Sequence, residues 1–133
     1  MYYRRLLFLL LISSLILFSE TIVVDTIGVE GDSLQIALDS TTLLAGIDTV
    51  LVMNGTYHLN INPNEYDSMF MGLLMRDSVV LFSENGALSC TLTGLSQDKL
   101  DTALHVIYCN SISNNSVIKG FTIKDGNAID WEV

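Results

Sequence analysis

Cysteine is scarce in this chain: Cys90 and Cys109 are the only two among 133 residues. Two cysteines do not make a scaffold built from disulfides. Without a CxxC pair or a His/Cys cluster, the sequence also gives no basis for a structural zinc site. Both cysteines lie in apolar segments, where free cysteine packs as a small apolar side chain. The pattern favours two buried or stacked thiols, although an oxidising compartment would permit a bridge.

Basic residues are also few, with 6 Lys and Arg against 15 Asp and Glu and a formal net charge of −9. Nucleic acids recruit Lys and Arg to their phosphates, so this balance argues against a nucleic-acid partner. It equally disfavours polyanionic substrates, unless a local basic cleft or bridging cations are present. The simplest interpretation is that an acidic surface keeps the protein dispersed in solution.

The N-terminus has the composition of a secretory signal. Arg4 and Arg5 give it a basic start, an apolar run covers 6–18, and Ser19 and Glu20 end the run. A membrane-spanning helix needs about 20 apolar residues, and Glu20 stops this run short of that length. We therefore expect a signal that is cleaved near Ser19, with an uncleaved anchor as the alternative.

These features predict a signal peptide at 1–19 and one domain at 20–133, since the remaining length fits a single domain. The expected location is extracytoplasmic, either secreted or at the cell surface. Contact with a membrane is expected only through the signal segment before cleavage.

One amphipathic helix is predicted near the start of this domain. Asp32 or Ser33 offers a side-chain oxygen that can cap a helix N-terminus. Apolar residues follow at helical spacing, namely Leu34, Ala37 and Leu38, with Ile36 and Leu43 or Leu44 extending the face. This pattern predicts about two to three turns of helix, and Gly46 ends the segment.

After the helix the pattern changes to short strands with turn residues between them. Tyr57, Leu59 and Ile61 alternate with polar residues, so they share one face of a strand. Asn85-Gly86 is typical of a turn. The predicted strands cover 50–52, 57–61, 69–75, 79–82, 88–92, 104–108 and 117–123.

These strands recur in a pattern of three. Val50, Val79 and Val117 each open an apolar strand that leads towards Asn-Gly or Asp-Gly, and two further short strands lie between each pair. Three strands per coil is the plan of a three-faced solenoid. No later segment has the pattern of a crossover helix that could cover a flat parallel sheet. We therefore expect a β-solenoid of about two to three coils.

The order of these motifs resembles the N-terminal part of the right-handed parallel β-helix superfamily, the pectate lyase-like fold. Many members have a capping helix, then a strand like GDTVLVxPGTY, then ILxG, then SVIxGFTIxxGNA. The counterparts here are Leu34–Asp39, Ile47–Tyr57, Cys90–Gly94 and Ser116–Ala128, so the resemblance covers 33–128. Two departures are Met53-Asn54, where a small residue and proline are commoner, and an expanded loop from Asn62 to Met71.

The resemblance implies an all-β, right-handed parallel β-helix with an N-terminal capping α-helix. Stacked coils need a cap at each end to avoid an open sheet edge. The chain stops at Trp131-Glu132-Val133 without a second cap. Residues 20–133 are therefore expected to be the N-terminal part of a domain that is truncated at its C-terminus. An open last coil would favour self-association, unless the residues after Ile123 close the edge.

The function that this implies is an exported surface or extracellular scaffold that binds polysaccharide. The alternative is the N-terminal fragment of a polysaccharide lyase or glycoside hydrolase whose active site lies beyond residue 133. Catalytic members of the superfamily place acidic clusters and a basic residue on later coils, so paired carboxylates cannot be assigned in this chain. A complete small adhesion module is a third hypothesis. Catalytic residues therefore stay unknown.

Candidate site residues are sparse. Asp125, Asn127 and Asp130 could gather oxygen ligands for Ca²⁺ near the last turn, although turn-forming residues are expected there in any case. His58 and His105 stand alone, and single histidines are more often structural than catalytic. The sequence therefore predicts no cofactor and no resident metal, with Ca²⁺ as the one ion that its turns could hold.

Other polar and sulfur-containing residues have simple structural interpretations. Asp98, Lys99 and Asp101 lie in a polar loop and are expected to be solvated. The methionines Met53, Met69, Met71 and Met75 fit as core filler better than as metal ligands. Asn54-Gly55-Thr56 and Asn114-Asn115-Ser116 match the glycosylation sequon, but both also fit turns.

Overall fold

The computed structural model describes residues 19–25, 32–41, 46, 48–59, 62–63, 70–100 and 102–127. The apolar run at 6–18, and with it the signal-peptide prediction, lies outside the described residues.

The described residues form short strands and a short helix. In chain order they are β1 (Thr21–Val24), α2 (Asp32–Ser40), β2 (Asp48–Val52), β3 (Gly55–His58), β4 (Asn62–Pro63), β5 (Phe70–Leu74), β6 (Val79–Ser83), β7 (Cys90–Thr93), β8 (His105–Tyr108), β9 (Val117–Lys119) and β10 (Thr122–Lys124). The all-β class predicted from the sequence is confirmed.

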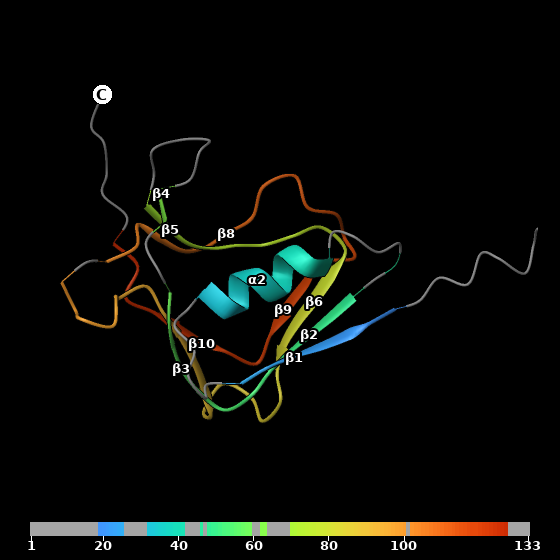
Figure 1. Ribbon diagram of the computed structural model, residues 1–133, viewed down its shortest axis with the longest axis horizontal. Coiled ribbons are helices and arrows are strands. Elements are labelled where there is room, and N and C mark those ends of the chain that lie inside the picture. Colours follow the sequence, from blue (N-terminus) through green and yellow to red (C-terminus); the bar gives the residue numbers. More distant parts are fainter. Residues whose placement is uncertain are drawn as a thin grey trace, which may run out of the picture.

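The strands make three sheets, which we name A, B and C. Sheet A has the order β1-β2-β6-β9, sheet B has the order β10-β7-β3, and sheet C has the order β4-β5-β8. All pairs are parallel except β4 with β5. From β2 onward the chain visits A, B and C in turn, and each such passage is called a round here. The sheets enclose a common interior in Figure 1.

Residues that face the interior stack in register between rounds. Val50 pairs with Leu81, and Leu81 pairs with Ile118, so an apolar column runs through sheet A. Tyr57 and Leu92 are adjacent in sheet B in the same way. Leu81, Leu92 and Val50 are fully buried. Burying a side chain of this size stabilises the fold by about 1.5–3 kcal/mol, so these columns are its main source of stability.

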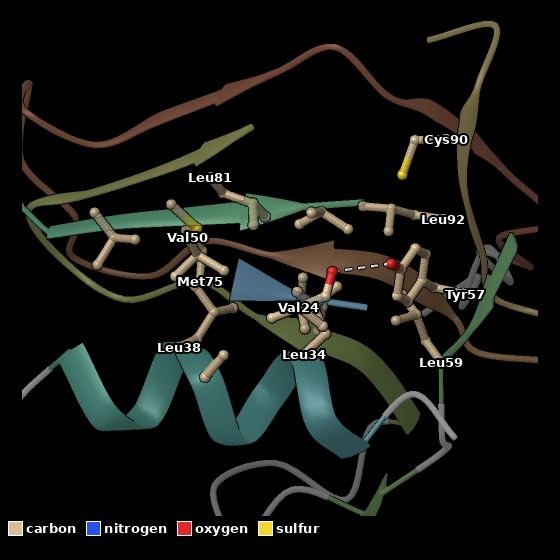
Figure 2. Close-up of a cluster of buried hydrophobic side chains, with 14 of the residues drawn as sticks. Val24, Leu34, Leu38, Val50, Tyr57, Leu59, Met75, Leu81, Cys90 and Leu92 are labelled. Carbon is tan, nitrogen blue, oxygen red and sulfur yellow. Dashed lines mark hydrogen bonds between the residues drawn. The ribbon is translucent and has the colours of Figure 1, made fainter. Parts of the chain in front are cut away.

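Helix α2 covers one end of this interior. Leu34 and Leu38 have no exposed surface, and they point from the helix into the apolar cluster shown in Figure 2. Ala37 is 5% exposed and belongs to the same cluster. The sequence placed these three residues on the buried face correctly.

The prediction was wrong for Ile36, which is 64% exposed. An α-helix turns by about 100° per residue, so a position two residues from both Leu34 and Leu38 points away from them.

Ser33 does not cap the helix, because its hydroxyl has no hydrogen-bond partner within the described part of the chain. The side chain of Asp32 lies outside the described residues, as do Leu43 and Leu44.

Polar side chains join the helix to sheet C. The backbone N–H of Leu74 donates to Oε1 of Gln35 at 2.8 Å, and Nε2 of Gln35 donates to the Leu74 carbonyl at 3.2 Å. One helical turn after Gln35, the carboxylate of Asp39 forms an ion pair with Arg76 at 2.6 Å. These two bonds of Gln35 satisfy the backbone N–H and C=O of Leu74, at the end of β5 that β4 does not reach. The sequence reasoning did not anticipate this contact.

Two strand predictions needed correction. The single strand expected at 117–123 is divided into β9 and β10 at Gly120, whose φ of 79° turns the chain from sheet A to sheet B. The strand expected at 88–92 begins only at Cys90, and Leu88 is fully exposed in the turn before it. An apolar residue next to Asn-Gly was therefore mistaken for part of the strand.

Candidate functional site

The outer face of sheet B carries two columns of polar side chains, which we name the sheet B polar face. One column contains Thr56, Thr91 and Thr122, and the other contains His58, Thr93 and Lys124. The register fixes both columns, because the residues of each are direct partners on neighbouring strands. Neighbouring strands lie about 4.8 Å apart, so each column repeats a hydrogen-bonding group at that interval.

A hydrogen-bonded cluster lies at one end of the second column. The hydroxyl of Thr93 donates to Oδ2 of Asp125 at 2.6 Å and accepts from the backbone N–H of Leu95 at 3.3 Å. Nζ of Lys124 lies 3.7 Å from the same carboxylate oxygen. Because Thr93 is only 1% exposed, its hydroxyl positions Asp125 and is not open to a ligand.

His58 has a defined orientation in this cluster. Its Nδ1 lies 3.0 Å from the carbonyl oxygen of Leu95. A carbonyl can only accept, so Nδ1 carries the proton and Nε2 of the neutral ring is left as an acceptor. The side chains of His58, Lys124 and Asp125 therefore offer an acceptor, a cationic donor and a carboxylate on one face. This set can bind hydroxyl groups.

The first column is accessible from solvent. Thr56 and Thr122 are exposed and Thr91 is half-buried. The hydroxyl of Thr122 donates to the carbonyl of Ala87 at 2.8 Å and keeps its lone pairs as acceptors. The threonine column thus adds repeated donors and acceptors beside the His58 column. Single-residue reasoning missed this face, because it depends on register between residues about thirty positions apart.

Of the three expected Ca²⁺ ligands, the structure describes Asp125 and Asn127. Asp125 is bonded to Thr93 and lies beside Lys124, whose charge opposes a cation at the same oxygen. The backbone N–H of Asn127 donates to the carbonyl of Ala103 at 2.9 Å. Asp130 lies outside the described residues. Among the residues that the structure describes, no group of three or more His, Cys, Asp or Glu could hold a metal ion.

The two histidines lie in different sheets. His58 belongs to β3 in sheet B, while His105 belongs to β8 in sheet C. The His105 ring is half-buried, and its centroid lies 6.4 Å from that of Tyr108. His105 therefore has an aromatic neighbour in its own strand and lies apart from the sheet B polar face.

Asp98 stabilises its own loop. Its carboxylate accepts from the hydroxyl of Ser96 and from the backbone N–H of Leu100. These hydrogen bonds hold the pKa of Asp98 below its usual value. Asp98 and Lys99 are exposed, which confirms the expectation of a solvated loop for these two. Asp101 lies outside the described residues.

Asp77 joins the turns of successive rounds. Its carboxylate accepts from the backbone N–H of Ser113, which lies 36 positions away, and from the hydroxyl of Ser116. Hydrogen bonds from Ser113 are the main reason why the pKa of Asp77 is lowered. The hydroxyl of Ser116 in turn accepts from the backbone N–H of Ser78 at 2.9 Å. The sequence signal for this contact was only a polar turn before each sheet A strand.

One glycosylation motif takes part in a similar contact. Nδ2 of Asn85 donates to Oδ1 of Asn54 at 3.0 Å, so the two Asn-Gly turns are stacked. Asn114 lies in an exposed turn beside Ser113. The first sequon therefore begins at a bend and continues into β3, whereas the second begins in a turn.

The cysteines correct the sequence prediction in part. Both are free thiols, but Cys90 is buried whereas Cys109 is exposed. Desolvation by burial raises the pKa of both the Cys90 and the Cys109 thiol. The expectation of two buried thiols was wrong for Cys109, because it follows the last residue of β8 and lies outside the core.

Among the methionines, Met75 is 2% exposed and belongs to the core, and Met53 is half-buried. The side chains of Met69 and Met71 lie outside the described part.

No family model, curated protein or solved structure matches this chain. No helix among the described residues is long and apolar enough to cross a membrane.

Proposed function

We propose that this chain forms the capping region and first coils of an exported right-handed parallel β-helix that acts as a surface or extracellular scaffold and binds polysaccharide. The observation that carries the proposal is the sheet B polar face, in which threonine hydroxyls repeat in register over successive rounds beside His58 and Lys124. A repeating polar face is suited to a repeating polar polymer.

The β-helix part of the proposal is supported by the order in which the chain visits its sheets. In sheet A, β6 returns beside β2 and β9 returns beside β6; in sheet B, β7 returns beside β3 and β10 returns beside β7, always in parallel. Parallel pairing within one sheet needs a long connection between partners. Here that connection is the rest of each round, which is the construction of a three-faced coil. Helix α2 covers one end of the interior, where a coil of this kind has its cap.

The polysaccharide part is supported by the chemistry of the face. Thr56, Thr91 and Thr122 supply hydroxyls, and His58 supplies an acceptor nitrogen. Sugar hydroxyls donate and accept, so they pair with groups of both kinds. The net charge of −9 disfavours a polyanionic chain. We therefore propose a neutral polysaccharide as the ligand class, with binding that needs no catalytic group.

The test is binding of the exported protein to a panel of neutral polysaccharides in affinity electrophoresis. His58→Ala and Thr91→Ala should each weaken retardation several-fold, because each removes a hydrogen-bonding group from the sheet B polar face. Ser111→Ala is the control that also removes an exposed hydroxyl, since Ser111 lies in the turn after β8 and outside the sheet B polar face. Absence of binding to every polysaccharide, or equal loss in the Ser111 control, would refute the proposal.

The alternative is that the chain belongs to a polysaccharide lyase or glycoside hydrolase whose active site lies beyond residue 133. Assays for new reducing ends and for unsaturated products, run on the full-length protein with any polysaccharide that binds, separate this alternative from a scaffold. Product formation would identify an enzyme, whereas binding without products supports the scaffold.

A further inference from the structure

The outer face of sheet A differs in character from the outer face of sheet B. Its side chains alternate with inward-facing ones along each of four strands and form two columns in register. We name this surface the sheet A apolar face. Its residues are Thr21, Thr49, Val80 and Val117 in one column and Val23, Leu51, Phe82 and Lys119 in the other.

This face is apolar and open to solvent. Val23 is 58% exposed and Val117 is 40% exposed, while Leu51, Val80 and Phe82 are half-buried by their neighbours in the sheet. Parallel sheets usually have both faces covered. In sheet A the inner face packs on the core, and α2 lies on that same inner side in Figure 1. Covering the outer face would remove further apolar surface from water, which is favourable.

The charges around this face fit a second copy of the same chain. Lys119 is the only ionisable side chain among the eight positions, and its Nζ lies 5.0 Å from the centre of the Phe82 ring. Two chains of net charge −9 repel each other over most of their surfaces. They approach at the lowest electrostatic cost through a face that carries no carboxylate.

A two-fold arrangement also pairs opposite charges. If the axis runs along the strands, β9 of one copy lies over β1 of the other, because these are the two edges of sheet A. Lys119 is at one edge, and the exposed residues Glu20 and Asp25 bound β1 at the other. The cation of each copy then faces the acidic edge of its partner, twice by symmetry. The apolar side chains between them meet at the centre.

We propose that the sheet A apolar face binds a second copy of this chain in a two-fold, face-to-face dimer. Strands are about 4.8 Å apart and rise about 3.3 Å per residue, so the face covers only a few hundred Å². A standard interface buries about 800 Å² on each partner. The dimer is therefore weak and reversible. It leaves the sheet B polar face free on both copies, so it would raise the apparent affinity for a repeating ligand through bivalency.

The test is sedimentation equilibrium of the exported protein over about a hundredfold range of concentration, since mass action then resolves a weak dimer. Val117→Asp should weaken dimerisation at least about tenfold, because Val117 lies on β9, is 40% exposed, and would turn a carboxylate towards the acidic β1 edge of the other copy. Lys119→Glu is a second variant on the same strand and should act in the same direction. Ile36→Asp is the matched control, since Ile36 is 64% exposed on α2 and outside the face.

Folding of each variant is checked by circular dichroism before sedimentation. A monomer at every concentration would overturn the proposal, and so would equal effects of Val117→Asp and Ile36→Asp. Ile123→Asp addresses the last round, where Ile123 is 51% exposed. If that variant abolishes association while Val117→Asp and Lys119→Glu do not, the chain associates through its last strands and the proposed face is wrong. None of these results depends on polysaccharide binding.

Discussion

The hydroxyl of Tyr57 donates a hydrogen bond to the carbonyl of Val24 at 3.2 Å, and Figure 2 shows this bond inside the apolar cluster. Tyr57 belongs to sheet B and Val24 to sheet A, so the bond ties the two sheets together across the interior. The same hydroxyl also lies 3.1 Å from the carbonyl of Met53. A tyrosine that is 2% exposed needs such partners, because its hydroxyl is otherwise buried without compensation.

Tyr57→Phe should lower the free energy of unfolding by about 0.5–1.5 kcal/mol, the usual net value of one hydrogen bond. The loss stays modest because the Val24 carbonyl also accepts from the backbone N–H of Met53 at 2.9 Å. Urea unfolding at neutral pH measures the difference. A Phe variant as stable as the parent protein would show that the bond contributes nothing net.

Alkaline pH should destabilise the protein through the same residue. Burial raises the pKa of Tyr57 to about 12 from the usual 10.0, so the folded state holds its proton more tightly than the unfolded state. This contribution to stability is complete below pH 10 and is lost as the pH rises towards 12. Unfolding midpoints of the parent and Tyr57→Phe proteins, compared across this range, should converge as pH rises. Parallel curves would contradict this assignment.

Asp77→Ala should destabilise the protein at neutral pH and have little effect in strong acid. Hydrogen bonds from Ser113 hold the pKa of Asp77 below its usual 3.8. The stabilisation is therefore present above that value and is lost as the pH falls through the lower, folded-state pKa. Thermal unfolding at neutral and acidic pH measures the difference. A constant gap between the variant and the parent at both pH values would mean that the charge is irrelevant.

Leu81→Ala should lower the free energy of unfolding by about 2–5 kcal/mol, since Leu81 is fully buried in the middle of the sheet A column. Leu88→Ala is the control with the same chemical change, because Leu88 is fully exposed. It should alter stability by less than about 0.5 kcal/mol. Similar losses in both variants, measured by urea unfolding, would mean that the core is not organised as described.

The two thiols should differ in their rate of alkylation. Cys109 is exposed and should react with iodoacetamide in the folded protein, whereas buried Cys90 should react only after unfolding. Mass spectrometry of the labelled peptides locates the modified cysteine. Cys109→Ser serves as the control, since it should abolish labelling of the folded protein. Equal labelling of both thiols at low denaturant would contradict the burial of Cys90.

Much of the fold was predictable because it depends on local pattern. The short apolar run 50–52 was predicted to be a strand, and the structure places it in β2, with Val50 and Val52 buried and Leu51 half-buried between them. Helical spacing identified Leu34, Ala37 and Leu38 as the buried stripe of α2. The same reasoning failed at Ile36 and Leu88, where an apolar residue is exposed. Composition alone does not say on which side of an element a residue lies.

The sequence by itself determined the class of structure: short parallel-type strands, one amphipathic helix near the start, and turns at Asn54-Gly55 and Asn85-Gly86. Only the tertiary structure decided which residues share a face. His58, Thr93 and Lys124 form one column because β3, β7 and β10 pair in a particular register. That register depends on the number of residues in each round, and a shift of one residue would turn every side chain to the opposite face. Local pattern cannot fix a relationship between residues more than thirty positions apart.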